Sequence, residues 1–223
     1  MPDAPVTPIR HIFYLHGFAS SARSKKAAFF AERLRGHGLP LHCPDFNEPD
    51  FTSLTMTRML DQVARRVDRL EAGPIALIGS SLGAVVAIHT ATRLAARVDR
   101  LVLLAPAVMF AKDGHRFLGP ERVAGWRTSG TLDVFHFGYG GMRPLAYLFY
   151  EDSLGYDAFA AAFRQPALVF QGLRDDTVDH RVVEKYASER SNVTLSLLGD
   201  DHQLIASLPR IWSDVEPFLG LTE

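Results

Sequence analysis

Short apolar runs alternate with helical patterns along the chain, and this alternation predicts a mostly parallel sheet with helices on both of its faces. The first run, His11–Leu15, is apolar after its histidine, as expected for a strand buried on both sides. About six strands are expected, over residues 11–15, 39–44, 74–78, 100–105, 167–171 and 193–198.

Apolar positions three and four residues apart predict helices between these strands. In the segment from about 24 to 35, Ala27, Phe30 and Leu34 belong to one stripe, and Gly36 or Gly38 would end the helix. Further helices are expected at about 52–71, from Gly83 to about 97, after Asp179, and at about 206–219.

About sixty residues, from Pro106 to Gln165, are less regular and separate the fourth expected strand from the fifth. A connection of this length inside an α/β domain is usually functional. We therefore expect a cap or lid-like insertion at 106–165 within a single domain that spans 1–223. Its many aromatic side chains would line a hydrophobic substrate pocket or pack the insertion onto the core. The candidate substrate-binding residues are Tyr139, Met142 and Tyr147.

Two shorter segments of this insertion each have two interpretations. Gly138–Gly141 would be a hinge or only a turn. Pro144–Tyr150 resembles an amphipathic lid helix and is equally compatible with a buried segment.

The sequence Gly79-Ser-Ser-Leu-Gly83 lies between an apolar strand and a helix, which is the setting of a nucleophile elbow. Such a turn is sharp and strained, and its glycines leave room for the backbone. It lifts one hydroxyl off the sheet edge, near a helix N-terminus that favours developing negative charge. Ser81 is flanked by glycine at −2 and +2, whereas Ser80 is not, so Ser81 is the predicted nucleophile.

A serine hydroxyl needs a base to accept its proton. With a nucleophile elbow the order along the chain is serine, acid, histidine, with the histidine after the last strand. His202, directly after the strand at 193–198, meets both criteria among nine histidines. The main competitor, His180, falls at the start of a helix, where a surface position is expected.

The acid that orients the histidine should follow the fifth strand, where Asp175 and Asp176 are adjacent. The spacing G-x-x-D-x-x-V from Gly172 favours Asp175, and Asp176 would then be a turn residue. Asp200 and Asp201 adjoin His202, but neighbouring residues rarely face each other well, so we expect them to be solvated.

Two backbone N–H groups should hold the oxyanion of an acyl-transfer intermediate. One comes from the residue after the nucleophile, Leu82, and one from the loop after the first strand. In that loop Gly17 would let the backbone approach the site, and Phe18 would supply the second donor. The alternative is that His16-Gly17 only ends the strand.

These motifs together resemble the α/β-hydrolase superfamily, and specifically its small bacterial esterases of the YqiA-like kind. The resemblance rests on Tyr14-Leu-His-Gly-Phe-Ala-Ser-Ser21, on the elbow at Gly79–Gly83, on Asp175 and on His202. It implies an α/β-hydrolase fold and esterase or thioesterase activity on short acyl groups, without a cofactor. The two strands that usually precede the oxyanion loop strand are missing from the pattern, which suggests a minimal core.

Composition narrows the set of partners. Apolar residues make up 47% of the 223 residues and the net charge is −1, so charge gives no case for binding nucleic acid or an anionic membrane. The single cysteine, Cys43, excludes an internal disulfide and a thiolate zinc site, and is expected to be a small buried hydrophobe. The first eight residues do not resemble a signal peptide. We expect a cytoplasmic protein without metal or stable membrane insertion.

The function predicted from these residues is hydrolysis of a carboxylic ester through a Ser-His-Asp triad and an acyl-enzyme intermediate. A thioesterase or an acyltransferase would use the same groups on a small-molecule thioester or ester. A non-catalytic binding protein on the same fold is the interpretation from a different class. The acyl group, the alcohol and the oligomeric state are left open by the sequence.

Overall fold

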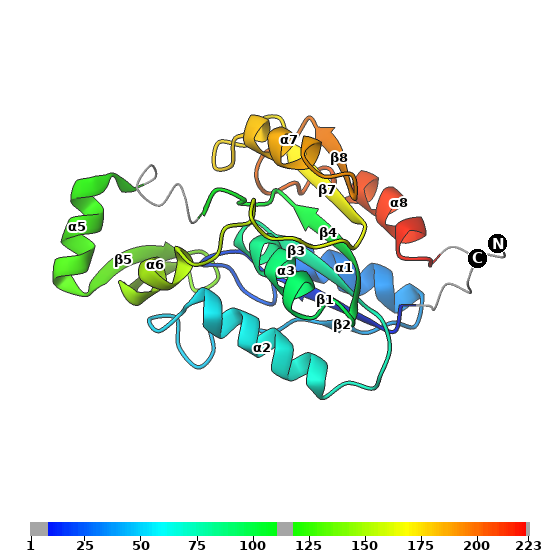
Figure 1. Cartoon of the computed structure of the whole chain (residues 1–223), viewed down its shortest axis with the longest axis horizontal. Coiled ribbons are helices and arrows are strands. Elements are labelled where there is room, and N and C mark those ends of the chain that lie inside the picture. The colour runs from blue at the N-terminus through cyan, green and yellow to red at the C-terminus, as the bar shows by residue number, and fades with distance from the viewer. Residues whose placement is uncertain (1–8, 111–117, 222–223) are drawn as a thin grey trace.

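A computed structural model of the chain describes residues 9–110 and 118–221, so the N-terminal lead-in and part of the insertion lie outside it. Six parallel strands form the main sheet in the order β2-β1-β3-β4-β7-β8, and β5 and β6 pair as a separate antiparallel hairpin (Figure 1). The strands are β1 His11–Leu15, β2 Leu41–His42, β3 Ile75–Ser80, β4 Val98–Leu104, β5 Thr131–His136, β6 Gly141–Ala146, β7 Ala167–Gly172 and β8 Val193–Leu198.

Helices connect the strands of the main sheet as the apolar stripes predict. They are α1 Lys25–Gly36, α2 Met56–Asp68, α3 Leu82–Arg93, α7 His180–Ser188 and α8 Leu208–Phe218. The described part of the insertion adds α5 Pro120–Ser129 and α6 Leu148–Ser153, which the stripes did not predict. Side-chain caps fix several starts. Thr55 accepts a hydrogen bond from the backbone of Arg58, so α2 begins at Met56 and not near residue 52. Asp179 caps α7 as expected.

The helices cover the two faces of the sheet in separate layers. α2, α3 and α7 pack on one face, against side chains such as Phe13, Leu77 and Val169. α1 and α8 pack on the other face, where Ile12 and Ile78 point, and Figure 1 shows α1 behind the strands. Adjacent strand residues thus enter opposite layers, which is why the strands are apolar at nearly every position.

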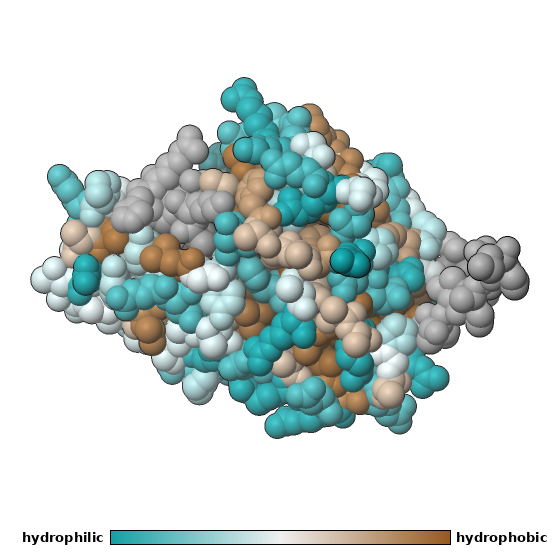
Figure 2. Space-filling model, in the orientation of Figure 1, coloured by the Kyte–Doolittle hydropathy of each residue, from teal (hydrophilic) through white to brown (hydrophobic). Residues whose placement is uncertain are grey.

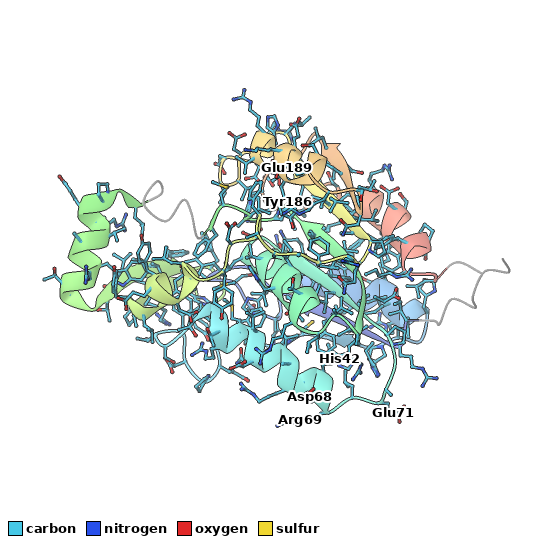
Figure 3. The ribbon with its side chains drawn as sticks, in the orientation of Figure 1. His42, Asp68, Arg69, Glu71, Tyr186 and Glu189 are labelled. Carbon is cyan, nitrogen blue, oxygen red and sulfur yellow. The ribbon has the colours of Figure 1, made fainter. Side chains whose placement is uncertain are left out.

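Two side chains labelled in Figure 3 show how helices lie beside the sheet near its two ends. Tyr186 lies on the side of α7 that faces the sheet and is fully buried (Figure 3). His42 belongs to the edge strand β2 beside the end of α2, where Figure 3 labels Asp68 and Arg69. The expected strand at 39–44 shortens to two residues here because β2 pairs on one side only, with β1. Within the described residues, no helix has the length and apolar character needed to cross a membrane.

The insertion after β4 is built from α5, the β5–β6 hairpin and α6, and extends from one side of the molecule (Figure 1). The predicted lid helix at Pro144–Tyr150 is wrong over its first part, because Gly141–Ala146 is a strand paired with β5. Leu145 opposite Leu132 gives the hairpin an inward apolar position, which a strand satisfies with period two. Gly138–Gly141 contains the hairpin turn and the start of β6. Figure 2 shows scattered apolar side chains at the surface of this region.

At the turn from β3 into α3, the backbone segments pack so closely that Gly79 and Gly83 have no room for a side chain. A Cβ atom added to Gly83 would lie 2.6 Å from the carbonyl oxygen of His16 and would also collide with the carbonyl of Leu15. A Cβ on Gly79 would lie 2.6 Å from the Cα of Ala84. These neighbours are backbone atoms of the central strands and the helix, so they cannot yield as a flexible side chain does.

We predict that Gly83→Ala lowers the free energy of unfolding by more than about 2 kcal/mol, because overpacking forces the backbone to shift. The matched control is Gly125→Ala in α5, where an added Cβ meets nothing within 4 Å. That change should be neutral or should stabilise by about 0.5–1 kcal/mol, as alanine does in a helix. Urea denaturation of both variants measures the difference, and equal effects would contradict this account of the turn.

Candidate active site

Ser81 occupies the turn between β3 and α3 in a strained backbone conformation. Its φ and ψ angles are 55° and −118°, which is rare for a residue with a side chain. Its N–H donates to the carbonyl of Leu104 at 2.9 Å, and its own carbonyl accepts from Ala84 at 3.0 Å. The strained residue is therefore held by the neighbouring strand and by the first turn of the helix.

The structure brings Ser81, His202 and Asp175 into one chain of contacts. The Nε2 atom of His202 lies 3.2 Å from the Oγ atom of Ser81, and its Nδ1 atom lies 2.8 Å from Oδ2 of Asp175. The three residues follow the carboxyl ends of β3, β8 and β7, which share one edge of the parallel sheet. With Nδ1–H donating to the carboxylate, Nε2 is free to accept the serine proton.

Asp175 is held as a carboxylate by its hydrogen bonds. Its side chain has 0% exposure, and burial alone would raise its pKa. The bonds from His202, from the backbone N–H of Val178 and from the amide of Gln171 outweigh burial, so the pKa lies below its ordinary value. Val178 and Gln171 each donate at 2.8 Å. An ionised carboxylate can fix the tautomer of the imidazole and stabilise its protonated form.

The competing candidates from the sequence have other surroundings. Asp176 is exposed and accepts from the hydroxyl of Thr177 at 3.2 Å. Asp200 is buried, contrary to the expectation of a solvated carboxylate, because it accepts from the backbone of Asp201 and of Ser207. His180 pairs with Glu184 along α7 at 2.7 Å.

The loop after β1 lies against the elbow. A Cβ atom on Gly17 would be 3.2 Å from both Ser80 O and Ser81 Cβ, so the absence of a side chain permits this approach. Phe18 and Leu82, the predicted sources of the oxyanion donors, line the same cavity as Ser81. Their role as donors stays a prediction.

The cavity beside Ser81 has a volume of about 600 Å³ and is walled mainly by apolar side chains. The insertion supplies most of the apolar wall. Its lining from the insertion includes Leu118, Trp126, Leu132, Val134, Leu145, Phe149 and Tyr150, together with Met109 and Phe110. Polar lining comes from the segment Asp175–Asp179. Such a wall suits an apolar group placed next to the serine.

Tyr139, Met142 and Tyr147, the predicted substrate-binding residues, are not among the residues that line this cavity. Tyr139 and Met142 are about half exposed, at 48% and 54%. Tyr147 stacks on Tyr150 and meets Trp126 edge-on, as part of the packing of the insertion. Side chains alternate between the two faces of a hairpin, and Met142 lies on the face opposite to that of Leu145.

Leu132 and Val134, two residues apart in β5, identify the inward face of the hairpin. This alternation can be read from the sequence, but it is too short to distinguish a strand from other apolar segments by itself. Among the described residues, no cluster of three or more histidine, cysteine, aspartate or glutamate side chains could hold a metal ion.

The sequence profile of one protein family, described as Uncharacterised protein family (UPF0227), matches residues 11–215. The chain belongs to this family. The match includes the whole main sheet and every residue of the Ser81–His202–Asp175 contact chain. Among curated proteins, no relative matches the chain.

Comparison with solved structures shows that this UPF0227 member has the α/β-hydrolase fold, as the sequence predicted. A protein from Agrobacterium vitis S4 superposes with a TM-score of 0.84 at 22% identity, covering 96% of this chain and 88% of its own. Est1E from Butyrivibrio proteoclasticus with bound ferulic acid has a TM-score of 0.81 at 19% identity, covering 98% and 91%. Mouse α/β hydrolase domain-containing protein 10 has a TM-score of 0.81 at 18% identity, covering 96% and 91%.

The environment of Asp175 predicts how stability depends on pH. Because its folded pKa is depressed, the carboxylate stabilises the fold fully above its unfolded pKa of about 3.9, and this contribution is lost as the pH falls through the folded value. We expect the advantage of the wild type over Asp175→Asn in the free energy of unfolding to shrink as the pH is lowered below about 4.

Urea denaturation across this range measures that advantage. Asp176→Asn is the matched control, because its exposed carboxylate accepts from a neighbouring hydroxyl and should contribute little to stability at any pH. An advantage over Asp175→Asn that grows toward acid pH would contradict the assignment of the hydrogen bonds.

Proposed function

We propose that the protein hydrolyses a carboxylic ester, with Ser81 as nucleophile, His202 as general base and Asp175 as the acid that orients it. The observation that carries this proposal is the contact chain from Ser81 Oγ through the imidazole to the buried Asp175 carboxylate, beside an apolar cavity. A binding protein on the same fold would not need this arrangement of three polar groups around a strained serine.

The reaction proceeds by acyl transfer. Nε2 of His202 takes the proton of the Ser81 hydroxyl as its oxygen attacks the ester carbonyl, and the N–H groups of Leu82 and Phe18 hold the resulting oxyanion. The imidazolium then protonates the leaving alcohol, and the C–O bond to the alcohol breaks. Water, deprotonated by the same imidazole, attacks the acyl-enzyme and releases the acid, and the serine regains its proton.

The substrate proposed for this site carries an uncharged, apolar group on at least one side of the ester. The insertion supplies most of the apolar wall, and we propose that it acts as a cap over the cavity. The fold is shared with Est1E, whose structure contains bound ferulic acid, so a carboxylic acid can be bound by a protein of this fold.

Covalent labelling tests the nucleophile. Incubation with a fluorophosphonate followed by peptide mass mapping should give one adduct, on Ser81, because only this hydroxyl has a base at 3.2 Å in the elbow. The adduct should be absent in Ser81→Ala and formed at least about 100-fold more slowly in His202→Ala. Ser80→Ala, on the adjacent hydroxyl, should still be labelled. Labelling at another residue, or none in the folded wild type, would overturn the proposal.

The cavity predicts a steep dependence of kcat/KM on acyl chain length for p-nitrophenyl esters. Val134 lines the cavity, so Val134→Phe should fill part of its volume and shift the optimum toward shorter acyl chains. We expect kcat/KM for the longest good substrate to fall about tenfold or more. Met142→Phe makes a matched change on the outer face of the hairpin and should leave the profile unchanged. A flat wild-type profile, or a shift in Met142→Phe alone, would show that the acyl group binds elsewhere.

A further inference from the structure

The turn of the insertion hairpin lies directly against the loop that follows β1. The N–H of Gly138 donates to the carbonyl of Ala19 at 3.3 Å. A Cβ atom added to Gly138 would lie 3.1 Å from Ser21 Cβ and 3.2 Å from the carbonyl carbon of Ser20. The insertion therefore touches the backbone of the same loop that carries Phe18, the proposed oxyanion donor.

A buried chain of hydrogen bonds reinforces this contact. Nε2 of His136, at the end of β5, lies 2.9 Å from Oδ1 of Asn47. The amide nitrogen of Asn47 donates to the carbonyl of Ser20 at 2.9 Å and to Asp45 at 2.8 Å. His136 is 0% exposed and Asn47 is 3% exposed, so water does not compete for these partners.

The orientation of the His136 ring is fixed on all sides. Its Nδ1 atom accepts from the backbone N–H of Tyr139 at 3.2 Å, so Nε2 carries the proton that is donated to Asn47. The ring stacks on that of Tyr139 at 4.0 Å and meets Phe51 edge-on at 4.6 Å. Asn47 Oδ1 thus receives a directed hydrogen bond from the insertion.

The other end of the loop is held in a similar way. Nδ1 of His16 lies 2.9 Å from the carbonyl oxygen of Gly17, which can only accept, so Nδ1 carries a proton and donates it. Nε2 of the same ring accepts from the backbone N–H of Phe46 at 2.9 Å and lies 3.3 Å from Oδ1 of Asp45. In a trans peptide the carbonyl of Gly17 and the N–H of Phe18 point in opposite directions. Fixing that carbonyl therefore fixes the direction of the Phe18 N–H.

We propose that His136 is a positioning residue for the oxyanion hole: through Asn47 and the carbonyl of Ser20 it holds the loop 16–21 in the conformation that directs the Phe18 N–H at the reacting carbonyl. The insertion then completes the catalytic site as well as walling the cavity. This inference rests on the proposed ester hydrolysis, and it adds a residue outside the Ser81–His202–Asp175 chain.

Two substitutions at His136 separate the hydrogen bond from the packing. His136→Phe keeps an aromatic ring between Tyr139 and Phe51 but removes both the donor to Asn47 and the acceptor of the Tyr139 N–H, so recovery by a variant that restores only the donor assigns the loss to the bond with Asn47. His136→Gln restores an N–H donor at nearly the position of Nε2. We expect kcat on a p-nitrophenyl ester to fall about 10- to 100-fold in His136→Phe, a fraction of the effect of losing an oxyanion donor outright, with KM within about threefold. His136→Gln should recover at least half of this loss on a logarithmic scale.

A trifluoromethyl ketone reports on the oxyanion hole itself, because Ser81 adds to it to form a stable oxyanion. Its inhibition constant should rise in His136→Phe by the same factor as kcat falls, since both depend on the Phe18 N–H. His37→Phe removes another histidine whose ring is hydrogen-bonded, here to Glu216, and controls for a general loss of stability. It should leave kcat and the inhibition constant unchanged.

A second pair of variants does not depend on His136 tolerating substitution. Gly138→Ala places a Cβ 3.1 Å from both the ring of His136 and Ser21 Cβ, so the hairpin must move off the loop by a few tenths of an ångström. Gly141→Ala is the matched control on the same hairpin, where the nearest atom is the end of the Arg143 side chain at 3.5 Å. Gly138→Ala should lower kcat at least threefold without raising KM, and Gly141→Ala should not.

Each result decides the inference. A His136→Phe variant with wild-type kcat, or one that changes KM alone, would overturn it, as would equal effects of Gly138→Ala and Gly141→Ala. If His136→Phe fails to fold, the glycine pair decides alone. A wild-type protein that neither turns over esters nor is labelled at Ser81 would instead refute the proposed function on which the inference rests.

Discussion

The close approach of α3 to the end of β1 is the constraint on which the rest of the site depends. Gly83 allows the first turn of the helix to touch the carbonyls of Leu15 and His16. This contact fixes the position of the elbow, and hence of Ser81, relative to the loop after β1. Gly17 makes the reciprocal approach from that loop. Two positions without side chains thus define the distance between Ser81 and Phe18, the proposed oxyanion donor on that loop.

Among the carboxylates near the site, Asp175 is the one whose charge is stabilised by a full set of hydrogen-bond donors. Asp175 receives N–H donors from Gln171, Thr177, Val178 and His202, which compensate for its complete burial. Gly172, at the end of β7, lets the strand pass within van der Waals distance of the backbone at Asp200, which brings the histidine loop alongside. The imidazole can therefore bridge the carboxylate and the serine without a change in the main-chain arrangement.

The insertion after β4 contributes to the cavity beside Ser81 and also contacts the loop after β1. Its inward side chains, such as Trp126, Val134 and Leu145, form much of the wall of the cavity. Its hairpin turn contacts the loop after β1 directly through Gly138, and His136 is linked to the same loop through Asn47. In the proposed mechanism, this hairpin would couple binding of the acyl group to the geometry of the oxyanion hole, because the same hairpin walls the cavity and holds the backbone near Phe18.

The sequence by itself determined the sheet, the two helical layers, the elbow at Ser81 and the candidates His202 and Asp175. Local signals suffice for these features: periodicity specifies strands and helices, and the glycine spacing specifies the turn. The loops that hold the base and the acid follow from strand order in a parallel sheet. Only the tertiary structure decided the inward face of the insertion, the burial of Asp200 and the bond from His136 to Asn47. These depend on residues far apart in the chain meeting in space, and no local pattern of apolar and polar positions records which partner a buried polar group will find.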